Sequence, residues 1–457
     1  MIFQRVKSEG IAHNSYFIAS GNDAAVIDPR RDCQIYIDLA QREGVKLKHI
    51  LETHRNEDYV IGSIELSHFT GAEIYHGPGL DWRYGSTLRD GQEFRMGSLR
   101  LTAIHTPGHT DESMCYAMAD LSSGEATVMV FTGDALFVGD VGRTDLYGPG
   151  EAPRLAGNLY HSIFNKILPL GDGVILCPAH SAGSICGLRI ADRDESTLGI
   201  ERAQNPVLQM KERDAFLRYK VAELHERPPY FRQLEKYNLE GPPLLGRLPL
   251  PPPLTPTEFR EAMEQGVIVI DASESHAFGG AHIKGSYSIW LEGLPMFAGW
   301  VLPYGRPILL VWEDRYHLER AVRYLVRLGY DSIQGYLKGE IAAWYNAGFP
   351  VEHLPLLTVH ELRSRMDSDQ RLVVLDVRRQ DEWDEGHIKG AQHIYVGHLE
   401  ERIAEVSKDK PTAVLCRTGH RASLGASILL RAGYREVYNV LGSTMAWRAA
   451  GYPITTE

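Results

Sequence analysis

The segment ILETHRNEDYVIGS (residues 50–63) follows an apolar, strand-like run and leads into a helix-like stretch, IELSHFTGA (64–72). This pattern places His54 and Asp58 at the end of a predicted strand, where α/β sheets commonly bind their ligands. Three further segments combine a strand-like run with a turn: TPGHTDESM (106–114) with His109, FTGDALFVGDVGRTDLYG (131–148) with Asp134, and CPAHSAGS (177–184) with His180. Imidazoles and carboxylates at several strand ends suggest one shared metal site.

A single loop histidine among the chain's 19 is usually solvated or hydrogen-bonded, so each segment alone is a weak indication. Four strand-end sites together are much stronger. In their order, these motifs resemble the metallo-β-lactamase superfamily, whose signature T-H-x-H-x-D-H is followed by a later histidine, a bridging aspartate and a final histidine. The resemblance covers roughly residues 1–235 and implies an αββα sandwich that holds a metal.

The sequence departs from that signature at two positions. Asn56 and Tyr59 stand where the two-metal hydrolases of the superfamily have histidines, so a second metal would keep only Asp58 and His180. The remaining ligands are His54, His109 and Asp134. Two neutral imidazoles and one carboxylate, with the other positions open, form the facial triad of non-haem Fe(II) oxygenases. We therefore expect one Fe(II) per chain.

This ligand subset and the sequence GRTD (142–145) resemble the persulfide dioxygenase branch of the superfamily. The resemblance implies that Arg143 lies near the active site, whereas the alternative is an ion-paired surface arginine. Cys186 resembles a cysteine of the multidomain members and is expected at the pocket rim near the substrate; alternatively it is a small buried residue in a tight turn. Ala182 stands where single-domain dioxygenases carry a tyrosine outside the ligand shell.

A proline-dense segment, EGPPLLGRLPLPPPLTP (240–256), separates this first domain from an internal repeat. Proline removes backbone donors and favours extended structure, so residues 240–254 are predicted to form a semi-rigid linker after a first domain of residues 1–239. Three pairs of blocks then match in the same order: LTPTEFREAM (254–263) with LTVHELRSRM (357–366), VIDASESHAFGGAHIKGS (269–286) with VLDVRRQDEWDEGHIKGA (374–391), and VRLGY…AAWYNAGFP (326–350) with LRAGY…MAWRAAGYP (430–453). They predict two similar doubly wound parallel-sheet domains, residues 255–350 and 357–457.

The segment TAVLCRTGHRASLGASILL (412–430) is an apolar strand, a six-residue loop and an amphipathic helix. Backbone N–H groups of such a loop surround the Cys416 sulfur, and the helix dipole with Arg417 and Arg421 favours a thiolate. Together with residues 375–391, this loop resembles the rhodanese family. The resemblance implies that Cys416 accepts a sulfane sulfur, with Arg421 as its catalytic partner. The substrate would lie among the remaining loop residues Arg417, Thr418, Gly419 and His420.

Loop length separates this family from related phosphatases, whose loop is usually one residue longer to admit phosphate; six residues favour sulfur transfer. In the middle copy, position 416 maps to Trp312, or with a one-residue shift to Val311 or Glu313, and none of these is a thiol. Acidic Glu313 and Asp314 replace the basic loop. Residues 255–350 are therefore predicted to be catalytically inactive, serving as a spacer, as an interface or in an unrecognised binding role.

Composition narrows the remaining possibilities. The 457 residues correspond to about three domains, and 44% hydrophobic with 23% charged residues is typical of globular proteins. A net charge of −11 argues against a general nucleic-acid binder. Scattered cysteines (33, 115, 177, 186 and 416) make no disulfide framework, and the first three are assigned to packing. No apolar run approaches the ~18 residues of a membrane span, so we expect a cytoplasmic protein without a membrane partner.

The whole layout resembles the multidomain persulfide dioxygenase-sulfurtransferases of bacterial sulfide detoxification. That resemblance implies oxidation of a thiol persulfide by O2 to sulfite, sulfur transfer that gives thiosulfate, and a homo-oligomer. The direction of the sulfur transfer and the thiol carrier stay open. Two alternatives remain: a two-zinc thioester hydrolase similar to glyoxalase II with a rhodanese appendage, and a sulfur-carrier scaffold whose first domain is degenerate.

Overall fold

The computed structural model describes residues 1–187, 189–223, 226–312 and 317–457. The chain divides into two compact units. The first consists of Met1–Arg247 with Val326–Gly329, and the second of Leu248–Leu325 with Tyr330–Glu457. Both copies of the internal repeat therefore lie mainly in the second unit.

Two β-sheets form the centre of the first unit. The first sheet has the order β1-β2-β3-β4-β5-β6, with β1 Ile2–Ser8, β2 His13–Ser20, β3 Asp23–Ile27, β4 Lys46–Leu51, β5 Glu73–His76 and β6 Ser86–Thr87. The second has the order β11-β10-β9-β8-β7, with β7 Glu93–Met96, β8 Leu99–His105, β9 Met114–Asp120, β10 Thr127–Gly133 and β11 Ile175–Pro178. Pairing is antiparallel along β1-β2-β3 and β7-β8-β9-β10, and parallel elsewhere.

Strand β2 shows why these sheets stack. All eight of its residues are buried, which requires cover on both faces. Tyr16 and Ile18 pack into the core between the sheets, together with Phe131 of β10. Phe17 and Ala19 point to the opposite face, into a second core. Because side chains alternate along a strand, one apolar segment serves both cores.

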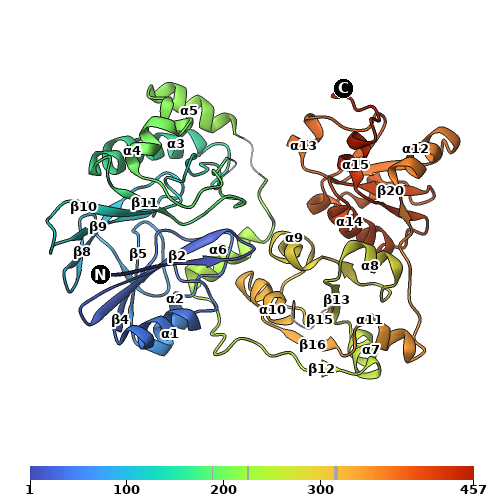
Figure 1. Ribbon diagram of the computed structural model, residues 1–457, viewed down its shortest axis with the longest axis horizontal. Helices are drawn as coiled ribbons and strands as arrows, with labels where there is room; N and C mark the ends of the chain where they lie inside the picture. Colours follow the sequence, from blue (N-terminus) through green and yellow to red (C-terminus); the bar gives the residue numbers. More distant parts are fainter. Residues whose placement is uncertain (188, 224–225, 313–316) are drawn as a thin grey trace. The chain divides into compact units, whose positions relative to one another are not determined.

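Helices cover the outer face of each sheet (Figure 1). The first sheet is covered by α1 (Gln34–Glu43) and α2 (Ser63–Thr70). The second is covered by α3 (Ala152–His161), which continues into the π-helix Ser162–Ile167, and by α4 (Leu198–Gln204) and α5 (Arg213–Ala222). Helix α6 spans Phe231–Glu240. The predicted αββα sandwich is confirmed.

Each copy of the repeat forms a five-stranded parallel sheet, and the two strand orders correspond one to one. The first order is β12-β16-β15-β13-β14, with β12 Pro253–Leu254, β13 Ile268–Asp271, β14 Tyr287–Ser288, β15 Ile308–Val311 and β16 Ile333–Leu337. The second is β17-β21-β20-β18-β19, with β17 Leu356–Leu357, β18 Val373–Asp376, β19 Gln392–His393, β20 Thr412–Leu415 and β21 Val437–Val440. Strand β12 is formed by the last two residues of the predicted linker.

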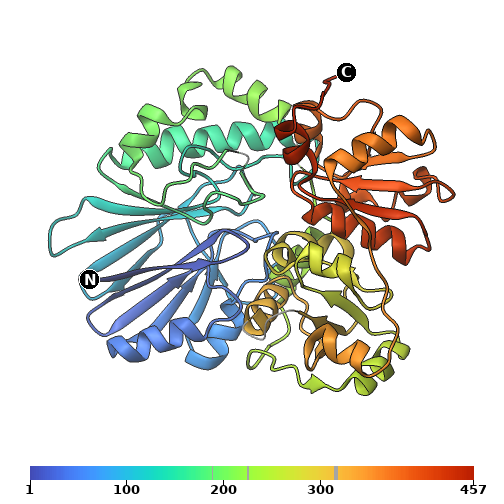
Figure 2. The ribbon, with the colours of Figure 1, turned by 45° about the vertical axis from the view of Figure 1, so that its right-hand side comes forward.

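Helices lie on both faces of these sheets (Figure 2), which is the predicted doubly wound arrangement. The first copy has α7 Pro256–Glu264, α8 Ser275–Gly280, α9 Leu294–Val301, α10 Leu318–Arg327 and α11 Glu340–Asn346. The second has α12 Val359–Ser368, α13 Gln380–Asp384, α14 His420–Arg431 and α15 Ser443–Ala449. Helices α7 and α12 begin with the same capping box, Thr255 with Glu258 and Thr358 with Glu361. The repeat is therefore preserved down to the helix starts.

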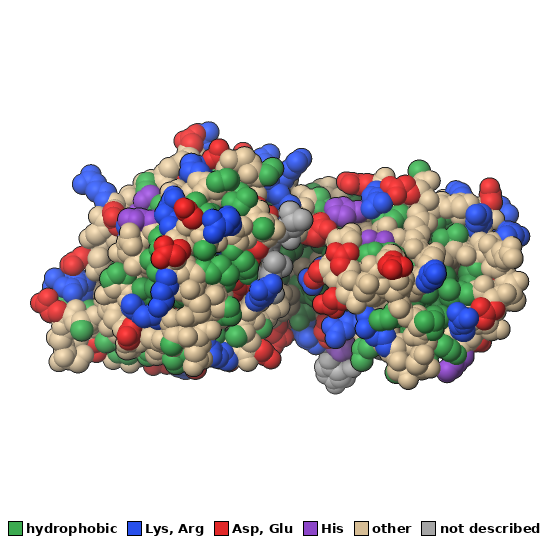
Figure 3. Space-filling model, turned by 90° about the horizontal axis from the view of Figure 1, so that it is seen from above, with side chains coloured by type: hydrophobic (Ala, Val, Ile, Leu, Met, Phe, Trp, Pro, Cys, Tyr) green, Lys and Arg blue, Asp and Glu red, His purple; other side chains and the backbone are tan. Residues whose placement is uncertain are grey.

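Basic and acidic side chains are interspersed over the face of the molecule seen in Figure 3. Within the described residues, no helix is long and apolar enough to cross a membrane.

Candidate functional site

The strand ends of the first unit bring the predicted ligands together. His54 follows β4, His109 follows β8, and Asp134 follows β10. Asp134 Oδ2 lies 3.8 Å from His54 Nε2 and 3.6 Å from His109 Nε2, and the two imidazole rings lie 5.0 Å apart, edge to face. All three residues are buried. The geometry thus unites the three side chains that the sequence analysis selected.

A fourth side chain, Glu57, lies among these three. Its Oε1 is 3.3 Å from His109 Nε2, and its Oε2 is 3.9 Å from His54 Nε2. Glu57 was not among the ligands predicted from the sequence, because it occupies a variable position between two positions of the signature. An acidic residue beside Asp58 at a strand end was the available signal.

The histidine ring orientations are fixed from outside the centre. Asp28 accepts hydrogen bonds from the Thr53 backbone N–H (2.8 Å) and hydroxyl (2.6 Å). Because the Thr53 hydroxyl already donates its proton to Asp28, its oxygen can only accept from His54. The His54 Nδ1–H therefore donates to Thr53 Oγ1 at 2.9 Å. His109 Nδ1 donates to the Arg143 carbonyl at 3.0 Å. With Nδ1 committed in this way, each ring in its neutral form directs its Nε2 lone pair to the centre, as metal-binding histidines do.

This arrangement fits a divalent cation. His54 Nε2, His109 Nε2, Glu57 Oε2 and Asp134 Oδ2 are buried and have no hydrogen-bond partner among the described residues. The nitrogen lone pairs and carboxylate oxygens repel one another when no hydrogen-bond donor lies between them. Burying such unpartnered polar atoms costs free energy of folding. Without a cation, burial lowers the pKa of His109, but the Glu57 carboxylate raises it to about 9. A proton then substitutes for the positive charge of a metal.

Asp58 and His180 form a chain behind Asp134. His180 Nδ1 lies 2.7 Å from Asp134 Oδ1, and its Nε2 lies 3.0 Å from Asp58 Oδ2. Burial alone lowers the pKa of His180, but Asp134 and Asp58 raise it well above its usual value. His180 therefore orients the Asp134 carboxylate. With Cys186, the same pair also forms a compact group of donor atoms that could hold a second ion.

The two replaced positions of the signature supply no ligand. Asn56 Nδ2 donates to the His54 carbonyl at 3.2 Å, so the amide faces the backbone. The Tyr59 ring is fully buried and packs on His13, with 4.1 Å between ring centroids. It also forms a small apolar cluster with Ile11 and Ile61.

Arg143 and Cys186 both lie close to this centre and are fully buried. Arg143 pairs with Asp145 through two hydrogen bonds of 2.7 and 2.9 Å. Arg143 is therefore ion-paired but buried, which differs from the alternative of a surface arginine. Cys186 Sγ donates to Glu57 Oε1 at 3.6 Å, and burial raises its thiol pKa well above the usual value. This placement agrees with the alternative of a small buried residue and differs from a place at the pocket rim.

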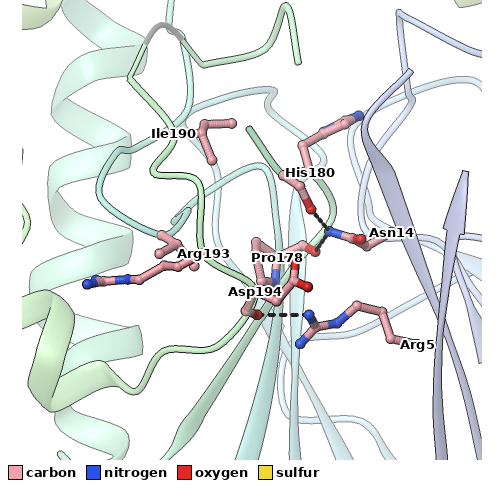
Figure 4. Close-up of a pocket in the computed structure, with 9 residues that line it drawn as sticks. Arg5, Asn14, Pro178, His180, Ile190, Arg193 and Asp194 are labelled. Carbon is pink, nitrogen blue, oxygen red and sulfur yellow. Dashed lines mark hydrogen bonds between the residues drawn. The ribbon is translucent and has the colours of Figure 1, made fainter. Parts of the chain in front are cut away.

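A small pocket borders His180 (Figure 4). Arg5 and Asn14 line it from β1 and β2, and Pro178 and His180 line it from the end of β11. Asn14 Nδ2 donates to Ser181 Oγ at 2.8 Å, and Arg5 donates to the Asp194 carbonyl at 2.8 Å. The pocket thus adjoins the chain of carboxylates and imidazole behind Asp134.

The second unit holds the predicted sulfur-transfer loop. Cys416 follows β20 directly, and the loop ends where α14 begins at His420. The Gly419 backbone N–H donates to Cys416 Sγ at 3.1 Å, with Gly419 in the left-handed region at φ 116°. Arg417 and Thr418 are exposed. One backbone N–H of the loop therefore donates to the sulfur, in the direction that the sequence predicted.

Residues outside the loop hold two of its members. Arg421 donates to both Glu382 oxygens, at 2.5 and 2.8 Å. The imidazole of His420 has its Nε2 2.9 Å from Glu274 Oε2, and the Trp290 ring lies 5.0 Å from the imidazole. Glu274 and Trp290 belong to the middle copy of the repeat. That copy therefore contributes to the surroundings of the Cys416 loop, which agrees with the interface role among the alternatives predicted for it.

Trp312 is the counterpart of Cys416, since each is the first residue after the corresponding strand, β15 or β20. Its ring is buried and packs on Tyr336, with 4.5 Å between centroids. The predicted correspondence agrees with this placement. Glu313 and Asp314 lie outside the described residues.

Comparisons with known proteins agree with these two kinds of site. The metallo-beta-lactamase superfamily model matches residues 9–180, and the rhodanese-like domain model matches residues 255–347 and 358–450. A mitochondrial persulfide dioxygenase of Bos taurus is 31% identical over 202 residues, covering 41% of this chain and 66% of that protein. A Schizosaccharomyces pombe protein described as a probable hydroxyacylglutathione hydrolase is 29% identical over 160 residues, covering 34% and 58%.

Among solved structures, a metallo-beta-lactamase from Staphylococcus aureus has a TM-score of 0.66 at 28% identity, covering 74% of this chain and 98% of that one. The chain therefore consists of a metallo-β-lactamase superfamily domain followed by two rhodanese-like domains. Within that superfamily, its first domain is a homologue of the persulfide dioxygenases.

Proposed function

We propose that the protein is a non-haem Fe(II) persulfide dioxygenase coupled to a rhodanese sulfurtransferase. The observation that carries the proposal is the set of buried, unpartnered donor atoms on His54, His109 and Asp134. Two imidazoles and a carboxylate on one side of an ion are typical of Fe(II) oxygenases. Bound Fe(II) would supply O2 activation next to the substrate sulfur.

The chain's own residues prepare that centre. Thr53 and the Arg143 carbonyl hold the two imidazoles by their Nδ1 atoms, and His180 holds Asp134. Burial excludes bulk water, which strengthens these interactions. The proposed overall reaction is RSSH + O2 + H2O → RSH + SO3²⁻ + 2 H⁺, so the terminal sulfur is oxidised and O2 is reduced.

Sulfur transfer at Cys416 would use a second persulfide. The thiol takes the terminal sulfur, RSSH + Cys-SH → RSH + Cys-SSH, and the resulting persulfide passes it to sulfite, giving thiosulfate. The N–H of Gly419 and the positive charge of Arg421 favour anionic sulfur beside the loop. One chain that carries both activities raises the effective concentration of sulfite at the second site. The loop would equally support the reverse reaction.

Oxygen-electrode traces test this proposal with anaerobically purified, Fe(II)-loaded protein and glutathione persulfide or coenzyme A persulfide. We expect persulfide-dependent O2 uptake that is lost in His109→Ala. The Cys416→Ser variant should keep the uptake and release sulfite in place of thiosulfate. O2 uptake that persists in His109→Ala, or thiosulfate formation that persists in Cys416→Ser, contradicts the proposal.

Two observations favour a second candidate, a two-zinc thioester hydrolase. Asp58, His180 and Cys186 could hold another ion, and the hydroxyacylglutathione hydrolase relative has detectable similarity. Against it, Asn56 and Tyr59 supply no imidazole. Two zinc ions per chain with hydrolysis of a glutathione thioester would support this candidate.

A further inference from the structure

We infer that Glu57 is a fourth protein ligand of the metal in the first domain. The inference rests on the proposed metal site and deepens it. Glu57 is fully buried, and its Oε2 has no hydrogen-bond partner among the described residues. In contrast, Asp58 Oδ2 and Asp134 Oδ1 both contact the His180 ring, so these two oxygens already have a partner.

The distances from Glu57 match those among the other ligands. Glu57 Oε1 lies 3.3 Å from His109 Nε2 and Glu57 Oε2 lies 3.9 Å from His54 Nε2, whereas a single oxygen of Asp134, Oδ2, lies 3.6 and 3.8 Å from the same two nitrogens. Ligand bonds of about 2.1 Å place neighbouring donors roughly 3.0 Å apart around an octahedral ion and roughly 3.4 Å apart around a tetrahedral one. The Glu57 carboxylate thus lies within the same range of distances from the two imidazoles as the Asp134 carboxylate, although it faces them through two oxygens and not one.

Charge balance points the same way. Two neutral imidazoles with the Glu57 and Asp134 carboxylates carry a charge of −2, which one divalent cation neutralises. A buried carboxylate without a cation or donor is strongly disfavoured. Placing Glu57 on the ion removes that imbalance, while Cys186 donates to its other oxygen, Oε1.

Four protein ligands restrict how a substrate can bind. An octahedral ion would keep two open positions, one for O2 and one for a single sulfur atom. Glu57 therefore occupies a position that water or a second substrate atom would otherwise take. The centre should select substrates that bind through one terminal sulfur and should exclude chelating ones.

Metal titration tests this inference without using turnover. Metal-free wild type, Glu57→Gln and His109→Ala are titrated anaerobically with Fe(II) and with Co(II) against a competing chelator. Glu201→Gln is the control, because Glu201 is an equally buried carboxylate paired with Arg193, Ser196 and Asn205. We expect Glu57→Gln to bind the metal at least about tenfold more weakly than wild type, because replacing even a residue that only hydrogen-bonds to a metal ligand lowers metal affinity by about that factor. Affinity equal to that of wild type and Glu201→Gln overturns the inference.

A second measurement covers the case in which Glu57→Gln does not fold. In a crystal structure of the metal-loaded wild type, a Glu57 oxygen should lie about 2.2 Å from the ion. An oxygen more than about 3 Å away overturns the inference. Failure of the proposed function can be distinguished from failure of this inference. A protein that binds its ion through Glu57 but consumes no O2 with persulfide would contradict the proposed function and leave the inference intact.

Discussion

At the scale of single residues, Asp58 and His180 are the two side chains that bear most directly on whether the first domain could hold a second metal ion. In the signature of the two-metal hydrolases both would bind the second ion. Here His180 lies between Asp58 and Asp134, at 3.0 and 2.7 Å. The Asp58–His180 hydrogen-bonded pair orients the Asp134 carboxylate. Residues that hydrogen-bond to a metal ligand usually have this effect.

Replacing Asp58 tests that role. We expect Asp58→Ala to leave the metal content at one ion per chain while lowering the affinity by about 10- to 100-fold, since His180 loses its partner. Metal analysis after equilibrium dialysis gives both quantities. A drop from two ions to one on this substitution would instead make Asp58 a ligand of a second metal.

The sequence predicted His54, His109 and Asp134 as a group because each lies near a predicted strand end and because these three are the ligands retained from the superfamily signature that the motifs resemble. Glu57 could not be predicted in the same way. Its role depends on where the loop after β4 directs the side chain, and a glutamate next to an aspartate is common on protein surfaces. Burial of Cys186 against Glu57 was likewise invisible, since its turn is about 130 residues away in the chain.

At the scale of elements, the Cys416 loop depends on contacts from outside its own strand and helix. The loop joins β20 to α14, and Glu274, just before α8, contacts His420 at 2.9 Å. Both side chains are about one-third to one-half exposed, so solvent screens this pair. Glu274 is therefore a positioning residue with a modest effect.

We expect Glu274→Gln to lower the rate of sulfur transfer about two- to fivefold, corresponding to an interaction below 1 kcal/mol. The loss should appear in kcat or KM of transfer to sulfite, and persulfide-dependent O2 uptake should not change. Glu292→Gln is the matched control, because this exposed residue of the same copy pairs with Arg320. Equal transfer rates in both variants and wild type would exclude a positioning role for Glu274.

At the scale of the whole molecule, the two rhodanese-like copies lie in one compact unit. Matching blocks in the sequence predicted the shared fold, because the same local pattern specifies the same strands and helices twice. Contacts between the copies had no such signal. Trp300 of α9 packs on Tyr395 and His398, with ring centroids 5.3 and 5.4 Å apart, and against Gly397.

Trp300→Ala should therefore destabilise both copies together. Removing a buried tryptophan costs about 3 kcal/mol, which corresponds to a fall of roughly 6–12 °C in Tm for a unit of this size. Differential scanning calorimetry is expected to show the transition of this unit shifting as a whole. A transition that splits, with one copy unfolding at the wild-type temperature, would show that the copies unfold independently.

We propose that the first domain holds one redox-active ion and not two zinc ions. The most direct test measures metal content and O2 uptake on the same anaerobically purified sample. We expect about one Fe per chain, with one O2 consumed for each persulfide oxidised. Two zinc ions per chain, with thioester hydrolysis and no persulfide-dependent O2 uptake, would contradict the account.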